Sequence, residues 1–116
     1  MDHRTAAPVP ASRILEAKAV APADGKIKIY FKRDSGMPLL EGYPTLTIGG
    51  RPIAKIGKGE VLKVYLKPGT YVFGVPTDLT ATDTYEMTAQ VGGDNPTVYR
   101  ITFQPSGMRI QPTAGL

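Results

Sequence analysis

The chain has 116 residues, of which 41% are hydrophobic and 21% are charged, and it carries a formal net charge of +4. This length and composition suit one folded domain and exclude a disordered tail. The absence of cysteine excludes disulfides, thiolate metal sites and thiol nucleophiles, and a single histidine, His3, excludes a multi-histidine metal site. No apolar run reaches the roughly 20 residues that a membrane-spanning helix needs.

The first 23 residues are rich in alanine and proline, a composition that predicts a flexible, solvated tether. Within it, residues 12–20 suit either a short helix capped by Ser12 or an edge strand, and Pro22 would end such a helix. Two interpretations of this tether stay open. It is either the natural start of a cytosolic protein or the mature segment left after an export signal has been removed.

From residue 26 onward, apolar and polar side chains alternate in the pattern of half-buried strands. The first such segment places Ile27, Ile29 and Phe31 on one face, and its lysines and tyrosine on the other. Turns rich in glycine and proline separate the segments, and the Gly49–Gly50 pair predicts a tight hairpin. The expected strands cover residues 26–33, 43–48, 51–56, 60–67, 70–75, 84–91, 97–103 and 107–111.

Seven or eight short strands at this spacing predict an all-β fold, an antiparallel sandwich of the prealbumin-like or immunoglobulin-like type. No segment after residue 23 has a helical period. The expected organisation is a tether over residues 1–23, a β-sandwich domain over residues 24–112 and a short tail over residues 113–116.

Charge is distributed unevenly along the chain. Residues 26–67 hold nine Lys/Arg against three Asp/Glu, whereas residues 70–100 hold one arginine against four acids. Lysine alternates with tyrosine on two expected strands, an arrangement that can grip anionic groups and stack on flat rings. The alternative interpretation is that outward lysines protect strand edges from aggregation and that tyrosine simply favours strands.

Eight residues are the candidate binding residues. Six come from the two lysine–tyrosine strands, and the other two are leucines in the loop between the first two expected strands. These leucines could instead cap one end of the core. The eight candidates are Lys28, Tyr30, Lys32, Lys63, Tyr65, Lys67, Leu39 and Leu40.

The sequence shows no arrangement typical of catalysis. Asp78, Asp83 and Asp94 are the acids that could pair for hydrolysis, and with Asn95 they could bind calcium, but they sit in predicted turns without calcium-loop spacing. The glycine pairs are not followed by the Lys-[Ser/Thr] of a phosphate loop. We therefore predict no enzyme, no catalytic residue, no metal and no cofactor.

A series of motifs runs through residues 26–104: Ile29-Tyr30 with Arg33, Ile48–Arg51, Leu66–Tyr71 and Val98–Arg100. In this order the motifs resemble the bacterial family filed as domain of unknown function 2846. The resemblance implies a prealbumin-like or carboxypeptidase-regulatory-like sandwich without assigned catalytic residues. It also implies a lipoprotein or periplasmic protein, in which Met1 stands where a lipidated cysteine was.

Together these features predict a non-catalytic module of the cell envelope, a tethered β-sandwich that contacts a protein or glycan partner. The alternative is a polyanion or anionic membrane-surface binder that uses the basic residues 26–67. A hydrolase built on the loop acids ranks last. We expect no nucleic-acid partner and no transmembrane segment, so that any membrane association would be peripheral or through a lipid anchor.

Overall fold

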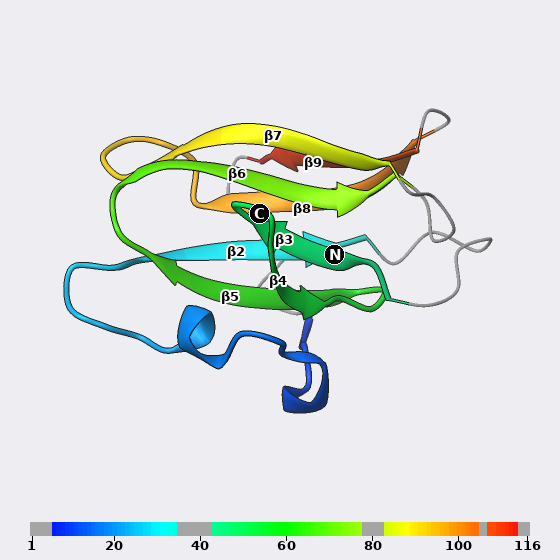
Figure 1. Cartoon of the computed structure of the whole chain (residues 1–116), viewed down its shortest axis with the longest axis horizontal. Helices are drawn as coiled ribbons and strands as arrows, with labels where there is room; N and C mark the ends of the chain where they lie inside the picture. Colours follow the sequence, from blue (N-terminus) through cyan, green and yellow to red (C-terminus); the bar gives the residue numbers. More distant parts are fainter. Residues whose placement is uncertain (1–5, 35–42, 78–82, 105–106, 114–116) are drawn as a thin grey trace.

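The computed structural model describes residues 6–34, 43–77, 83–104 and 107–113, which form two β-sheets packed against each other (Figure 1). Sheet A has five strands in the order β1-β5-β2-β8-β9, and sheet B has four in the order β4-β3-β6-β7. Two short 3₁₀ helices, η1 (Ala11–Arg13) and η2 (Ala17–Val20), precede β2. The strands are β1 (Ala7–Pro8), β2 (Ile27–Arg33), β3 (Thr45–Ile48), β4 (Arg51–Lys55), β5 (Glu60–Leu66), β6 (Gly69–Pro76), β7 (Thr84–Val91), β8 (Val98–Gln104) and β9 (Gly107–Pro112).

The expected all-β, sandwich-like architecture is confirmed for the described residues. Each of the eight expected strands corresponds to one of β2–β9, with ends that agree within two residues. The Gly49–Gly50 hairpin is also present between β3 and β4, with φ values of 61° and 77° that an L side chain rarely adopts. Alternation and turn chemistry therefore located these elements correctly.

The prediction of a purely antiparallel sandwich is wrong for two strand pairs. β2 runs parallel to β8, with Phe31 opposite Tyr99, and β1 runs parallel to β5. Between β2 and β8 the chain forms β5 of sheet A and all four strands of sheet B. The connection that joins β2 to β8 is therefore long. Such a connection allows two strands of one sheet to point the same way.

Three aromatic rings at the centre of the sandwich join the two sheets. Phe31 on β2 and Tyr99 on β8 stack in sheet A with ring centroids 5.7 Å apart. Phe73 on β6 of sheet B meets both rings edge to face, at 4.9 Å from Phe31 and 5.1 Å from Tyr99. All three side chains are buried. Aromatic pairs in this geometry contribute beyond the area that they bury.

The N-terminal segment (residues 6–23) packs against one side of the sandwich, a correction to the flexible tether expected there. The amide of Val9 donates to the carbonyl of Val61 on β5, and the amide of Leu15 donates to the carbonyl of Ile53 on β4. Ile14 also forms an isolated bridge with Ala54. The segment therefore joins the edge of sheet A to the edge of sheet B, at the bottom of Figure 1.

Gly107 at the start of β9 should tolerate no side chain. Its φ is 116°, and a Cβ there would lie 2.8 Å from the backbone oxygen of Thr77. We expect Gly107→Ala to lower the free energy of unfolding by about 1–3 kcal/mol in urea titrations, because both strain and the clash oppose it. Gly93 also has a positive φ, of 60°, but has open space around it, so Gly93→Ala is the matched control. Equal losses for the two variants would contradict this prediction.

Candidate functional site

Four of the predicted binding residues lie together on the solvent-facing side of sheet A. We call Lys28, Tyr30, Lys63 and Tyr65 the Lys/Tyr face. In the β2–β5 register, Lys28 is directly opposite Tyr65 and Tyr30 is directly opposite Lys63. Lysine and tyrosine therefore alternate both along each strand and across the pair.

The backbone hydrogen bonds of sheet A bring the four side chains close together. The amide of Tyr30 donates to the carbonyl of Thr97 on the β8 side, so the main chain of Tyr30 points away from β5. Tyr30–Lys63 and Lys28–Tyr65 are thus non-hydrogen-bonded pairs, in which Cα atoms approach to about 4.5 Å. The Lys28 ammonium also lies 5.8 Å from the centroid of the Tyr30 ring. This is a compact surface of two cations and two rings.

Exposure differs between the cations and the rings of this face. The lysines, Lys28 and Lys63, are exposed, whereas Tyr30 and Tyr65 are half-buried. Tyr30 lies opposite Val98 of β8, which is buried although it points to the outer side of the sheet. Tyr30 is therefore next to an apolar residue of β8, and it is itself only partly exposed to solvent.

Lys32 corrects the expectation that all the strand lysines are exposed, since its residue is only 5% exposed. It lies opposite Val61, which its aliphatic stem can cover, and its ammonium is 3.5 Å from the carboxylate of Asp34. Asp34 also accepts two hydrogen bonds from Arg100 on β8, one of them 2.6 Å long. Lys32 belongs to this ion-pair cluster and not to the Lys/Tyr face.

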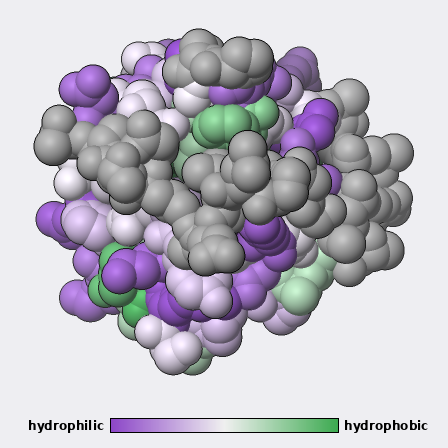
Figure 2. All heavy atoms as spheres, turned by 90° about the vertical axis from the view of Figure 1, so that its right-hand side faces the viewer, coloured by the Kyte–Doolittle hydropathy of each residue, from purple (hydrophilic) through white to green (hydrophobic). Residues whose placement is uncertain are grey.

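The remaining predicted binding residues lie elsewhere. Lys67 is exposed in the turn that follows β5, where its carbonyl accepts a hydrogen bond from the Tyr71 hydroxyl at 2.7 Å. Leu39 and Leu40 lie outside the described residues. The end of the sandwich shown in Figure 2 presents mostly hydrophilic side chains over its described surface, with small separate hydrophobic areas.

A groove of about 340 Å³ runs beside the Lys/Tyr face, between β5 and the N-terminal segment. Lys63 and Tyr65 line one wall, and Val9, Ile14 and Val20 contribute to the other. The face therefore continues into a partly apolar depression. A partner that contacts the face can also place an apolar group beside Tyr65.

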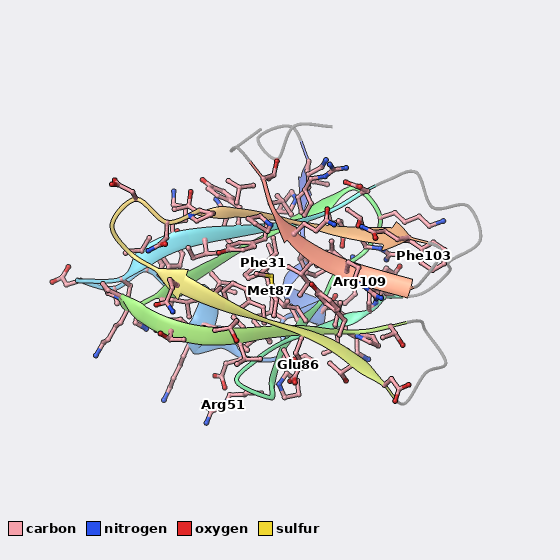
Figure 3. All side chains as sticks on the ribbon, turned by 90° about the horizontal axis from the view of Figure 1, so that it is seen from above. Phe31, Arg51, Glu86, Met87, Phe103 and Arg109 are labelled. Atoms are coloured by element: carbon pink, nitrogen blue, oxygen red, sulfur yellow. The ribbon has the colours of Figure 1, made fainter. Side chains whose placement is uncertain are left out.

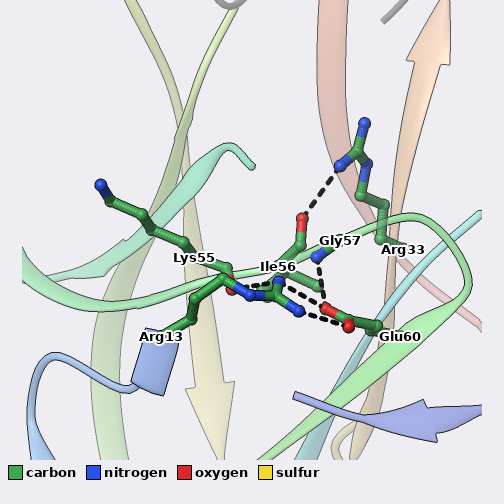
Figure 4. A network of polar contacts seen from close by, with 6 residues as sticks. All are labelled: Arg13, Arg33, Lys55, Ile56, Gly57 and Glu60. Carbon is green, nitrogen blue, oxygen red and sulfur yellow. Dashed lines mark hydrogen bonds and ion pairs between the residues drawn. The ribbon is translucent and has the colours of Figure 1, made fainter. Parts of the chain in front are cut away.

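A polar network fixes the N-terminal wall of this groove (Figure 4). Arg13 donates two hydrogen bonds to the carboxylate of Glu60, at 2.7 and 2.5 Å, and the amide of Gly57 donates a third at 2.6 Å. Arg13 also lies 4.0 Å over the ring of Tyr43 and donates to the carbonyl of Lys55. The paired geometry is the strong form of an arginine–carboxylate contact.

Perturbed pKa values gather at this network and in the core. The hydrogen bond from Arg13 lowers the pKa of Glu60, and the same bond raises the pKa of Arg13. Burial lowers the pKa of Arg33, which donates to the carbonyl of Ile56 at 3.0 Å, and burial raises the pKa of Tyr99. The first two shifts come from the Arg13–Glu60 contact, and the other two come from burial.

The acids considered for hydrolysis or calcium binding do not converge among the described residues. Asp83 precedes β7 and Asp94 follows it, so the strand separates them, while Asp78 lies outside the described residues. The side-chain amide of Asn95 donates to the carbonyl of Gly92 at 2.6 Å, as in a turn. Across the described ranges, no group of three or more His, Asp or Glu side chains is placed to hold a metal ion.

Comparisons with known proteins leave the chain without a match. No family model, curated protein or solved structure matches it. Within the described part of the chain, no helix has the length and apolar character needed to cross a membrane.

The network around Glu60 was not predicted from the sequence, although one signal was present. Arg33 has the same parity as Ile27, Ile29 and Phe31, so alternation alone would point it inward. Its burial and its bond to Ile56 agree with that parity. Arg13 and Glu60 are 47 positions apart, and no local pattern links them.

Proposed function

We propose that the chain is a non-catalytic binding module that uses the Lys/Tyr face to hold a protein or glycan partner in the bacterial cell envelope. The observation that carries the proposal is the alternating square of two lysines and two tyrosines across β2 and β5. Rigid aromatic rings supply contact area at low entropic cost, and the lysines select a partner with acidic or hydroxyl groups. The envelope location rests on the family resemblance.

The strand positions support binding over catalysis. The face lies on β2 and β5, which pair with each other along six residues, and it offers two cations and two rings. A rigid platform of this kind holds a partner in one orientation. Tyrosine is enriched at protein interfaces, so the two rings suit a binding surface.

The alternative function, binding of a polyanion or an anionic membrane surface, is favoured by the basic region but weakened by the ion pairs in it. Asp34 neutralises part of the charge of Lys32 and Arg100, which leaves Lys28 and Lys63 as the exposed cations of the face. With only two phosphate contacts, the logarithm of the binding constant would fall against the logarithm of the salt concentration with a slope of about −2. A dedicated polyanion site needs a denser cluster.

Removing both rings tests the proposal. We expect Tyr30→Ala with Tyr65→Ala to reduce partner retention by at least about 30-fold, because central aromatic residues dominate interface energies. The measurement is retention of envelope-extract proteins and of purified peptidoglycan on the immobilised chain. Phe103→Ala, which removes an exposed ring on β8 outside the face, is the matched control.

Three results would count against this function. Retention that survives the double tyrosine substitution would place the contact elsewhere. Strong retention on heparin, lost on Lys28→Glu with Lys63→Glu, would favour the polyanion alternative. Recovery of the native protein from the cytosolic fraction of its host would contradict the envelope location.

A further inference from the structure

The outer edge of β7 is the longest uncovered strand edge in the described part of the chain. β7 pairs with β6 along all eight of its residues, and no described strand pairs with its other side. The opposite side of the sandwich is different, because the N-terminal segment lies along β5 and β4 there. Figure 3 looks onto the side formed by β7 and β9, where β7 runs along the front.

The backbone hydrogen bonds show which β7 groups point away from the sheet. The amide of Thr77 donates to the carbonyl of Asp83 at 3.1 Å, which makes Thr77 and Asp83 a hydrogen-bonded pair. Because hydrogen-bonded and non-hydrogen-bonded pairs alternate along an antiparallel ladder, the odd-numbered β7 residues direct their N–H and C=O groups toward β6. The even-numbered residues turn outward and present four N–H and four C=O groups: Thr84, Glu86, Thr88 and Gln90.

This edge lacks the usual protection against strand addition. Proteins guard edges with lysine, proline, bulges or a covering segment. The β7 sequence TYEMTAQV has neither lysine nor proline, and its pairing with β6 has no register shift. Glu86 is the single charge on the strand. All four residues whose main chains face outward are also exposed.

The strand is complementary to itself in one antiparallel register. With a two-fold axis at Met87, Glu86 lies opposite Thr88 of a second copy, and Thr84 lies opposite Gln90. This register uses every outward N–H and C=O group and sets no like charges against each other. If the second strand is shifted by two residues in one direction, Glu86 lies opposite Glu86 of the other copy, and the two carboxylates repel. If it is shifted by two residues in the other direction, Thr84 lies beyond the end of the partner strand and has no residue of that strand to pair with.

Side chains on the inner side of β7 also fit this register. Met87 is half-buried between the sheets, as Figure 3 shows, and would meet Met87 of the second copy. Tyr85, whose ring lies 4.8 Å from the Arg109 guanidinium, would face Ala89. The small alanine leaves room for the ring and the guanidinium that covers it.

We propose that two copies of this chain form a symmetric dimer by antiparallel pairing of β7 with β7, which joins their B sheets into one eight-stranded sheet. The proposed contact is at the β7 edge of sheet B, whereas the Lys/Tyr face is on β2 and β5 of sheet A. Each copy therefore keeps its Lys/Tyr face uncovered. The dimer therefore presents two such faces.

Two opposite substitutions at Thr88 test both the dimer and its register. Thr88→Glu places a carboxylate opposite Glu86 of the second copy, and Thr88→Lys places an ammonium there. Two such contacts per dimer should change the dissociation constant by roughly 2- to 30-fold, upward for glutamate and downward for lysine. The measurement is sedimentation velocity of the full chain from micromolar to millimolar concentration.

Thr45→Glu is the matched control, because it adds the same charge to the same sheet on β3, away from the β7 edge. It should leave the dissociation constant unchanged, and circular dichroism should show that all three variants keep the fold. A monomer at every concentration would overturn the proposal. Effects of the same sign for Thr88→Glu and Thr88→Lys would overturn it as well, because the proposed register requires opposite signs.

Discussion

Replacing Phe73 with alanine should lower the free energy of unfolding by about 3–5 kcal/mol, the largest effect we expect from a single substitution. Phe73 is fully buried and is the ring through which sheet B contacts both Phe31 and Tyr99 of sheet A. Its removal leaves a cavity between two sheets whose strands are held by their own hydrogen bonds. Urea titration followed by circular dichroism measures the loss.

Phe73→Leu is the control for this prediction. Leucine keeps most of the volume but loses both edge-to-face contacts, so we expect a smaller loss than for alanine. If Phe73→Ala cost less than about 1 kcal/mol, a value typical of surface sites, the three-ring contact would not hold the sheets together.

Replacing Glu60 with alanine should lower the free energy of unfolding by about 1.5–3 kcal/mol, because it breaks charge-assisted hydrogen bonds to Arg13 and to the Gly57 amide. Both partners of the ion pair are largely shielded from solvent, with side chains 18% and 16% exposed. The N-terminal segment should then detach first. Faster hydrogen exchange at the amides of Val9 and Leu15 would report this, since both bond to the sandwich.

The Glu60 network also predicts the direction of a pH dependence. Contact with Arg13 lowers the pKa of Glu60 in the folded state. Its stabilisation is therefore complete above the unfolded-state pKa, about 4.3, and is lost as the pH falls through the lower folded-state pKa. Glu60→Gln should remove this acid-dependent loss. A wild-type chain and a Glu60→Gln variant with identical stability profiles below pH 5 would contradict the assignment.

Much of the fold followed from local patterns in the sequence. Alternation of Ile27, Ile29 and Phe31 against lysine and tyrosine identified β2 and its inner face, and the Gly49–Gly50 pair identified the β3–β4 hairpin. These features depend on neighbours within a few residues, where side-chain parity and backbone sterics decide the conformation. Four of the eight candidate binding residues also lie together because the β2–β5 register pairs them.

The parts that sequence did not predict depend on contacts between distant residues. The parallel β2–β8 pair, the Arg100–Asp34 ion pair and the Arg13–Glu60 contact each join positions that no periodicity relates. The packing of the N-terminal segment was missed for another reason. Its alanine and proline content masked three apolar residues, Val9, Ile14 and Val20, that pack against the core.

Lysine footprinting by mass spectrometry tests the central claim, that the Lys/Tyr face is the surface the chain uses. The chain is labelled with an amine-reactive reagent before and after incubation with envelope extract. We predict that Lys28 and Lys63 become protected, whereas Lys55 and Lys58, which are exposed outside the face, stay reactive. Unchanged labelling of Lys28 and Lys63, together with protection elsewhere, would contradict the claim.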